Sequence, residues 1–512
     1  MLSWIRKSLS PALIFFFILV IQTNAQQKPN IVLIYLDDLG YGDVSAYQAG
    51  TLQTPNMDVL ANGGLRFTNG YASSATCTPS RYALLTGTYP WRNQNAKILP
   101  GTAPLIIDTA QMTIPKMLKA QGYETAVIGK WHLGLGTGFV DWNQEIAPNP
   151  NHVGFDHSHI LAATQDRVPT VYIENGRVVN LDPKDPIQVD YDKNFDGEPT
   201  AISNPELLTM KWHHGHNNSI VNGIPRIGYM KGGDSAKWSD VDMADHFLEK
   251  GKAYIHEKAK SDKPFFLFFP MQQPHVPRTP HPRFEGKSGM GPRGDVILEA
   301  DWVIGEMLKT LEEEGVLENT LIIFSSDNGP VLNDGYYDDA VEKLGDHTPA
   351  GPFRGGKYSL YEAGTRVPFV TYWKGIIQHG VSDALVTQID LLASLAALVG
   401  SEEIGPDSQN LLEVFMGKSQ KGRDSFVLEA YTKTALRAGD WVMIPPYPGP
   451  AVEKNVNIEM GNSPDYQLYN LKEDPGQKTN LAQSNPEKLE EMKKKYQEIR
   501  GDNSKIEQVE LK

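Results

Sequence analysis

The stretch that decides the fold of this chain is Ile31-Val32-Leu33-Ile34-Tyr35-Leu36-Asp37-Asp38-Leu39-Gly40. Its first six residues form a continuous apolar run, which is typical of a β-strand buried on both faces of a parallel sheet. The run stops at two consecutive carboxylates, Asp37 and Asp38. The sequence therefore predicts a central strand that delivers acidic side chains to one end of a sheet.

Three other apolar runs end in the same way. Residues 125–129 precede Lys130-Trp131-His132, residues 265–269 lie shortly before Pro274-His275, and residues 321–324 precede Ser325-Ser326-Asp327-Asn328-Gly329. Ligands of open α/β sheets bind beyond the carboxyl ends of the strands. Because all four runs carry polar residues at that end, we predict that these residues form one site.

Helical patterns lie between the apolar runs. Ser239 and Asp242 look like a capping box for a helix that continues to about residue 258. Apolar residues recur at helical spacing from 297 to 311, and Gly315 ends that pattern. This alternation predicts an α/β fold, with a mostly parallel sheet sandwiched by helices.

Two parts of the chain have a different character. Residues 136–235 are rich in Asn, Asp, Gly and Pro, and we interpret them as inserted loops that shape a substrate pocket; a solvated excursion without a role is the alternative. After residue 419, short strand candidates at 426–429, 441–444 and 466–471 precede a helical stripe at 487–500. These elements predict a smaller C-terminal α+β subdomain over residues 420–512.

The inserted region contains two clusters of polar residues. His213, His214 and His216 are either plain loop histidines or pocket residues. A second cluster matches the start of a calcium loop and consists of Asp192, Asn194 and Asp196. The twelfth position of that loop is Ser203 instead of the usual Glu, so an ordinary surface loop is the alternative to a second metal site.

The N-terminal residues 1–25 read as a secretory signal. Arg6 and Lys7 precede an apolar run at 11–21 that is too short to span a bilayer, and Thr23-Asn24-Ala25 offers a cleavage site. An uncleaved anchor is the alternative. With no second long apolar run, we expect a mature protein that is periplasmic or secreted and has no membrane contact after cleavage. The formal net charge of −14 argues against a nucleic-acid partner.

Cys77 is the only cysteine of the chain, so it has no internal disulfide partner. It opens the sequence Cys77-Thr78-Pro79-Ser80-Arg81, which is suited to the first turn of a helix that Gly87 would stop. Backbone N–H groups at that end favour an anion, and Arg81 lies one turn later. A small buried structural cysteine is the alternative. A cysteine phosphatase is a poorer match, because its phosphate loop needs five residues between Cys and Arg and only three are present.

The polar residues at the strand ends suit a metal and an anion. Asp37, Asp38, Asp327 and Asn328 all offer oxygen donors, which favours calcium, with magnesium possible, over zinc. A helix cap and a turn are the alternatives when each pair is taken singly. Positive charge and titratable nitrogens come from a further set: Lys130, His132, His275 and Lys357.

The Cys-x-Pro-Ser-Arg sequence resembles the site that a formylglycine-generating enzyme recognises in type I sulfatases. The other motifs stand in the family's order, at residues 29–43, 129–134, 274–275, 326–329 and 356–368, with a C-terminal signature in Tyr469-Asn470-Leu471. The resemblance implies an alkaline-phosphatase-like catalytic domain over residues 26–419. It also implies that Cys77 is converted to formylglycine, whose hydrate is the nucleophile. The family often has Gly where this chain has Ala363, a backbone matter that we do not expect to touch the chemistry.

The resemblance assigns a role to each matching residue. Arg81 would fix the formylglycine, and Lys130 and Lys357 would bind the sulfate. His275 would be the general acid for the leaving alcohol, and His132 would deprotonate the sulfated hydrate to expel sulfate and restore the aldehyde. Calcium would be held by formylglycine 77, Asp37, Asp38, Asp327 and Asn328.

Export and the polar insert suggest a sulfated carbohydrate as substrate. Residues 166–169 and 220–231 look similar to bacterial carbohydrate sulfatases, and algal polysaccharides and glycosaminoglycan-type sulfates both fit. One alternative is a phosphodiesterase or phosphonate hydrolase of the same fold. The other is an inactive protein that binds sulfated glycans.

Overall fold

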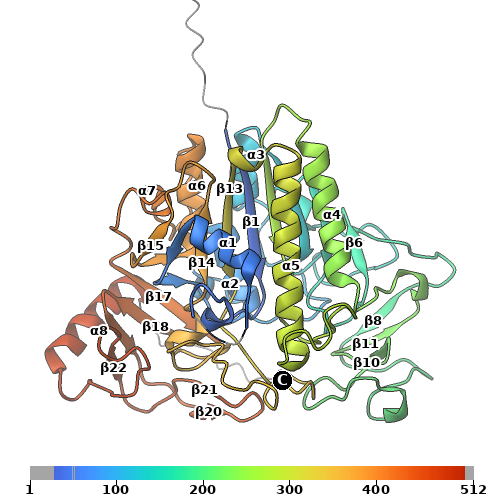
Figure 1. Cartoon of the computed structure of the whole chain (residues 1–512). Coiled ribbons are helices and arrows are strands. Elements are labelled where there is room, and N and C mark those ends of the chain that lie inside the picture. Colours follow the sequence, from blue (N-terminus) through green and yellow to red (C-terminus); the bar gives the residue numbers. More distant parts are fainter. Residues whose placement is uncertain (1–27, 49, 51, 502–512) are drawn as a thin grey trace, which may run out of the picture.

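The computed structural model describes residues 28–48, 50 and 52–501 (Figure 1). The predicted signal segment, residues 1–25, lies outside the described residues. In the described part of the chain, no helix is both long enough and apolar enough to cross a membrane.

A ten-stranded sheet forms the centre of the described structure. Five neighbouring strands, in the order β13-β1-β12-β4-β5, run parallel, and antiparallel pairs join β13 to β14 and β5 to β6. In spatial order the strands are β15 (Gly380–Ser382), β2 (Leu65–Phe67), β14 (Phe369–Tyr372), β13 (Thr320–Ser326), β1 (Asn30–Leu36), β12 (Phe265–Pro270), β4 (Glu124–Lys130), β5 (His157–Leu161), β6 (Tyr172–Glu174) and β7 (Arg177–Val178).

The four apolar runs are four adjacent strands of this sheet, as the sequence predicts. The register pairs Leu36 at the end of β1 with Ser326 at the end of β13. The backbone N–H of Asp327 donates to the Leu36 carbonyl at 3.0 Å, and that of Asp37 donates to the Gln273 carbonyl at 3.1 Å. The residues that follow these strands are therefore held together at one edge.

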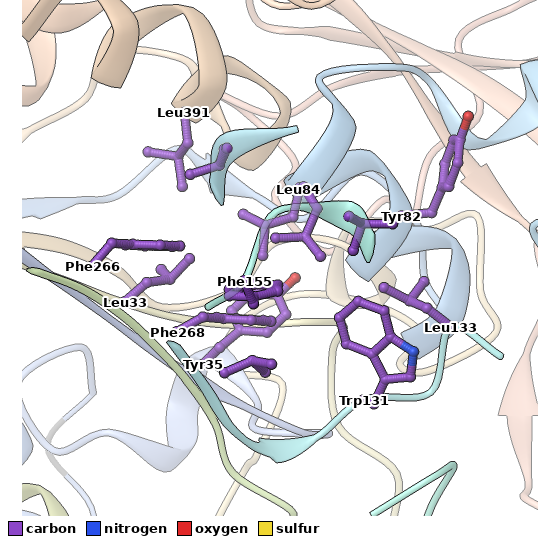
Figure 2. Close-up of a cluster of buried hydrophobic side chains, with 14 of the residues drawn as sticks. Leu33, Tyr35, Tyr82, Leu84, Trp131, Leu133, Phe155, Phe266, Phe268 and Leu391 are labelled. Atoms are coloured by element: carbon purple, nitrogen blue, oxygen red, sulfur yellow. The ribbon is translucent and has the colours of Figure 1, made fainter. Parts of the chain in front are cut away.

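Both faces of β1 are covered. Ile31, Leu33 and Tyr35 belong to one hydrophobic core and the intervening Val32, Ile34 and Leu36 to another. The first core, where Leu33 and Tyr35 lie among Phe266, Phe268 and Phe155 (Figure 2), is covered by α2 (Cys77–Thr86), α3 (Ile114–Ala120) and α6 (Leu391–Val399). The second core is covered by α1 (Pro55–Gly63), α4 (Met243–Lys258) and α5 (Gly291–Glu313). The α/β sandwich is confirmed.

The predicted ends of two helices have different outcomes. Gly315 follows α5 with φ 70°, and its N–H donates to the Glu312 carbonyl at 3.0 Å, so it terminates the helix as expected. The prediction of a capping box before α4 is wrong. Asp242 occupies the N-cap position but makes no side-chain capping hydrogen bond, and Ser239 lies outside the helix.

The interpretation of residues 136–235 as inserted loops is incomplete. β5, β6 and β7 come from this region. β5 pairs in parallel with β4, and the register runs from Ala126 opposite His157 to Lys130 opposite Leu161. The remainder forms small two-stranded sheets: β8 (Gln188–Asp190) with β11 (Tyr229–Lys231), and β9 (Ile220–Val221) with β10 (Ile224–Pro225). The region both widens the main sheet and extends beyond it (Figure 1).

The C-terminal part is a separate four-stranded antiparallel sheet with one long helix. Its strands are β17 (Ser425–Ala430), β18 (Lys433–Ala438), β19 (Trp441–Ile444) and β22 (Gln467–Asn470). Met492 and Tyr496 of α8 (Pro486–Arg500) pack in the core beneath it. The sequence predicts this α+β architecture but misses β18. Two further pairs of short strands lie outside these sheets: β3 (Gly70–Tyr71) pairs with β16 (Val386–Thr387), and β20 (Val452–Glu453) pairs with β21 (Ile458–Glu459). A short helix, α7, spans Leu412–Phe415.

Candidate active site and metal centre

Cys77 is the first residue of α2, as its sequence context predicts. The helix ends at Thr86, and Gly87 caps it in the left-handed conformation with φ 60°. The Cys77 side chain is buried and is a free thiol. Burial raises its pKa to about 11, which disfavours the thiolate that cysteine-nucleophile chemistry requires.

His132 faces Cys77 directly. Its Nδ1 lies 3.2 Å from Cys77 Sγ, and its Nε2 lies 3.0 Å from the Leu99 carbonyl oxygen. Because a carbonyl oxygen only accepts, Nε2 carries the hydrogen and Nδ1 is left as an acceptor toward residue 77. Burial first, and then the positive charges of Lys130 and Arg167, lower the His132 pKa well below its usual value.

Arg81 holds two of the predicted metal ligands. Its Nη2 donates to Asp37 Oδ2 and Asp327 Oδ2, both at 2.8 Å, and its Nη1 donates to the Lys130 carbonyl at 3.0 Å. All three charged side chains are fully buried. These hydrogen bonds of Arg81 orient carboxylates, and its predicted contact with residue 77 stays a prediction.

Two oxygens of the predicted metal ligands have no partner. Among the described residues, Asp37 Oδ1 and Asn328 Oδ1 are buried without a hydrogen bond, although Asn328 Nδ2 donates to Asp38 Oδ1 at 2.7 Å. A buried polar atom without a partner is costly. Unpaired carboxylate and amide oxygens are the donors that a hard cation would satisfy, so this set fits calcium or magnesium.

A carboxylate–histidine group lies at the same place. Ligand atoms of Asp37, Asp38 and His275 all lie within 4.8 Å of one another, and His275 Nε2 is 3.9 Å from Asp38 Oδ2. Burial raises the pKa of both aspartates to about 6; the neighbouring charge of Asp327 adds to the effect on Asp37. A bound cation would stabilise the ionised form of these two carboxylates and so lower their pKa.

Both predicted lysines reach the carboxylates. Lys130 donates to Asp37. Lys357 Nζ donates to Asp38 Oδ2 at 2.9 Å and to Asp334 Oδ2 at 2.8 Å. The two carboxylates hold the Lys357 pKa well above its usual value although burial opposes them. Asp334 is a site residue that the sequence reasoning missed, because it lies in a loop with no periodic pattern.

His275 also has a defined hydrogen-bond pattern. Its Nδ1 lies 2.8 Å from the Val276 carbonyl oxygen, so Nδ1 carries a hydrogen and Nε2 faces Asp38. Burial and the charges of Lys357 and Lys130 lower its pKa well below the usual value. His275 therefore presents Nε2 to Asp38, whereas His132 presents Nδ1 to Cys77.

The inserted region contributes three polar side chains next to this cluster. His216 Nε2 lies 2.8 Å from Asp166 Oδ2, and Arg167 Nη1 lies 3.0 Å from the same oxygen. The charge of Arg167 and the hydrogen bond with His216 hold the Asp166 pKa well below its usual value despite burial, and His275 contributes as well. His216 is thus a buried site neighbour, not a plain loop histidine; the sequence signal was only its place in a histidine cluster.

Other candidates lie outside the site. Asp192 and Asp196 are exposed, and the group of Asp37, Asp38 and His275 is the one metal-suited cluster of His, Cys, Asp and Glu found among the described residues. A cavity of about 450 Å³ is lined by His213, Tyr336 and Tyr337. None of the predicted site residues lines it.

Comparison with known proteins gives consistent matches over most of the chain. The model of the Sulfatase family matches residues 29–401. N-acetylgalactosamine-6-O-sulfatase from Bacteroides thetaiotaomicron is 50% identical over 479 residues, covering 93% of each chain. Human arylsulfatase A is 31% identical, covering 91% of this chain and 87% of that protein.

Comparison with solved structures also gives matches over most of the chain. A Bacteroides thetaiotaomicron structure, titled for the metabolism of multiple glycosaminoglycans, superposes with TM-score 0.90 at 50% identity, covering 92% of this chain and 99% of that one. A sulfatase from Pseudoalteromonas sp. superposes with TM-score 0.68 at 25% identity, covering 92% of this chain and 89% of that one.

Proposed function

Because this chain belongs to the sulfatase family, we propose that it hydrolyses the sulfate ester of a carbohydrate, with a formylglycine formed from Cys77 and a bound calcium ion. The observation that carries this proposal is the 3.2 Å approach of His132 Nδ1 to Cys77 Sγ, beside buried ligand oxygens that have no partner among the described residues. The rival phosphodiesterase and inactive binding protein have no observation of their own in their favour.

The relatives support a particular sulfate ester. The 50% identical protein is named for N-acetylgalactosamine 6-O-sulfate, and the solved structure at the same identity is titled for glycosaminoglycan metabolism. We therefore take the 6-O-sulfate of N-acetylgalactosamine, free or within a glycan, as the substrate to test first.

Calcium, when bound, would neutralise charge on the sulfate oxygens as the S–O bond breaks. Its proposed ligands are Asp37, Asp38, Asp327, Asn328 and residue 77. The hydrated aldehyde at residue 77 would supply the attacking hydroxyl, whose proton would pass to a neighbouring carboxylate as its oxygen bonds to sulfur. Arg81 keeps Asp37 and Asp327 oriented through its two 2.8 Å hydrogen bonds. Lys130 contacts Asp37 and Lys357 contacts Asp38, so both would bind the sulfate of a substrate placed at the calcium ion.

One histidine would donate a proton and the other would accept one. When the bond between sulfur and the alcohol oxygen breaks, doubly protonated His275 would give its Nε2 proton to that oxygen and keep its Nδ1 hydrogen on the Val276 carbonyl, so the product would leave as a neutral alcohol. The negative charge of a bound sulfate ester would favour this protonated form, against the burial that lowers the His275 pKa. His132 Nδ1 would then take a proton from the remaining hydroxyl at residue 77, so that sulfate leaves and the aldehyde returns, and water would add to the aldehyde to restore the hydrate. The Leu99 hydrogen bond supports this assignment, because it leaves Nδ1 of His132 as the acceptor.

The proposal includes export and maturation. Residues 1–25 would be removed as a signal, leaving a catalytic domain over residues 26–419 and a subdomain over 420–512 in a periplasmic or secreted protein. A formylglycine-generating enzyme would act on the Cys77 sequence before or during folding, since the folded chain buries this side chain. N-terminal sequencing of exported protein should start at Gln26; an intact N-terminus on membrane-bound protein would contradict the cleavage.

Product analysis tests the function. Matured protein is incubated with N-acetylgalactosamine 6-sulfate, its 4-sulfate isomer and a nitrophenyl phosphodiester, with Cys77→Ala as the inactive control. We expect sulfate release from the 6-sulfate, less from the 4-sulfate and none from the control. Faster cleavage of the phosphodiester would favour the phosphodiesterase, and binding of the sugars without turnover would favour the inactive binding protein.

A further inference from the structure

The hairpin between β17 and β18 has an unusual turn. Ala430 pairs with Lys433, so the turn consists of Tyr431 and Thr432 alone. Their φ angles are 49° and 65°. Two-residue turns with both φ values positive are normally made by Asn-Gly, and a β-branched residue such as Thr432 rarely adopts this conformation. Non-glycine residues held in this region indicate a constraint that is often functional.

The turn directs the Tyr431 side chain toward the site. Its ring packs against a cluster that includes Val331 and Tyr358, and its centroid is 5.1 Å from that of Tyr358. The Tyr431 hydroxyl is buried and makes no hydrogen bond within the described part of the chain. A buried hydroxyl without a partner lowers stability, and a bound ligand could provide the missing partner.

A chain of contacts places this hydroxyl relative to the metal centre. Lys357 Nζ bridges Asp38 and Asp334, and the Tyr358 hydroxyl donates to Asp334 Oδ1 at 3.3 Å. The Tyr431 ring packs against Tyr358 at the end of this series, with the two rings tilted by 31°. Burial and the charge of Asp334 raise its pKa well above the usual value. Because Lys357 would bind the sulfate and Tyr431 is separated from Lys357 by Tyr358 and Asp334, Tyr431 is a candidate contact for the saccharide that carries the sulfate.

The hairpin is fixed to the segment that precedes the nucleophile. The Glu429 N–H donates to the Ser73 carbonyl at 3.2 Å, and the Ala75 N–H donates to the Glu429 carbonyl at 2.8 Å. The Tyr358 N–H in turn donates to the Ala75 carbonyl at 2.8 Å. The position of Tyr431 is thus set with respect to Cys77, two residues beyond Ala75, although it belongs to the C-terminal sheet.

We propose that Tyr431 is a substrate-binding residue supplied by the C-terminal subdomain, whose hydroxyl hydrogen-bonds an oxygen of the saccharide that carries the sulfate. This role rests on the proposed function, because it requires a carbohydrate substrate. The strained turn then has a reason, since it places a polar group that the catalytic domain does not provide.

The test compares Tyr431→Phe with wild type on N-acetylgalactosamine 6-sulfate and on nitrophenyl sulfate, which has no sugar hydroxyls. Loss of one neutral hydrogen bond should lower kcat/KM for the saccharide about 3- to 10-fold, mainly through KM. Hydrolysis of the aryl sulfate should stay within about twofold of wild type, because the sulfate contacts are intact. Tyr466→Phe is the matched control: its ring packs on α8, 4.4 Å from Lys493, within the same subdomain, and it should change neither rate.

A second variant separates binding from folding. Thr432→Gly suits the positive φ at this position and keeps the Tyr431 ring, so it should raise Tm while leaving kcat/KM for the saccharide unchanged. An unchanged saccharide rate in Tyr431→Phe, or an equal loss on both substrates, would overturn the role of Tyr431 alone. A wild-type enzyme that hydrolyses aryl sulfate but no sulfated saccharide would overturn the carbohydrate substrate, and this role with it.

Discussion

Nδ1 of His132 lies 3.2 Å from Sγ of Cys77, while Nε2 of the same ring is held by the Leu99 carbonyl. The ring therefore presents an acceptor to residue 77 and cannot easily turn away. This geometry places the lone cysteine, at the start of α2, against a base that follows β4, and it distinguishes the two histidines of the site by position.

Removal of this base should separate two chemical events. In His132→Ala we expect the alcohol product to appear in a rapid burst of one equivalent per enzyme, followed by slow release of sulfate, because the proton acceptor for the second step is gone. Rapid-quench measurement of both products tests this. His379→Ala, at an exposed position, is the control. Equal slowing of alcohol and sulfate release, with no burst, would contradict the assignment.

His275 should matter according to the leaving group. A sugar alcohol leaves poorly unless it is protonated, whereas nitrophenol leaves readily as an anion. His275→Ala should therefore lower kcat/KM for the saccharide sulfate by about 10²–10⁴-fold and affect the aryl sulfate much less. Lys130→Ala and Lys357→Ala should damage both substrates similarly, because they would contact the shared sulfate group. Equal losses on both substrates for His275→Ala would remove it from the acid role.

Calcium should stabilise the fold as well as support activity. The unpaired oxygens of Asp37 and Asn328 would gain a partner, and a ligand at 100 times its Kd adds about 2.7 kcal/mol to the free energy of unfolding. We expect chelation to lower Tm and calcium to restore it. Asn328→Ala should shrink that calcium-dependent shift. Stoichiometric zinc in active protein, without calcium or magnesium, would contradict the ligand assignment.

Glu299 gives a pH-dependent prediction away from the chemistry. It is 1% exposed, and burial raises its pKa from 4.5 to about 7. The folded state therefore holds a proton that the unfolded chain loses between these values, so stability falls as pH rises from 4.5 to 7 and stays low above. The difference corresponds to roughly 3 kcal/mol at most.

Glu299→Gln removes this penalty and should raise Tm at pH 8 while changing little at pH 4.5. Its hydrogen bonds with the His281 N–H and Gln273 Nε2 can be kept by rotation of the two amides. Glu313→Gln, an exposed position on the same helix, is the control. A stabilisation that is equal at both pH values would show that burial of charge is not its cause.

The sequence was informative where one local pattern determines structure. Continuous apolar runs predicted β1, β4, β12 and β13, and parallel strands bring their carboxyl ends together. The structure accordingly brings Asp37, Asp327 and Lys130 together at this edge, whereas Lys357 comes from a loop that the strand pattern does not place. β5 was missed because it reads His-Ser-His-Ile-Leu; its polar His159 is buried against His246, with 2.7 Å between the Nε2 atoms. A partner on a distant helix cannot be read from strand periodicity.

Loop residues were missed for a related reason. Asp334 is placed in the site by its ion pair with Lys357, and Tyr431 is placed beside it by its ring contact with Tyr358; both contacts join residues that are distant in the sequence. Neither position carries a periodic or motif signal. β18 was missed because Lys-Thr-Ala-Leu-Arg-Ala contains several good helix formers, and its pairing with β17 decides its structure instead.

The most direct test is mass spectrometry of the peptide that contains residue 77, from protein produced with a formylglycine-generating enzyme. Conversion of CH₂–SH to CHO makes the peptide about 18 Da lighter than the thiol form. We predict that activity increases in proportion to this lighter form, and that Cys77→Ala has neither the aldehyde nor turnover. A fully active preparation in which residue 77 is entirely an intact thiol would contradict the account.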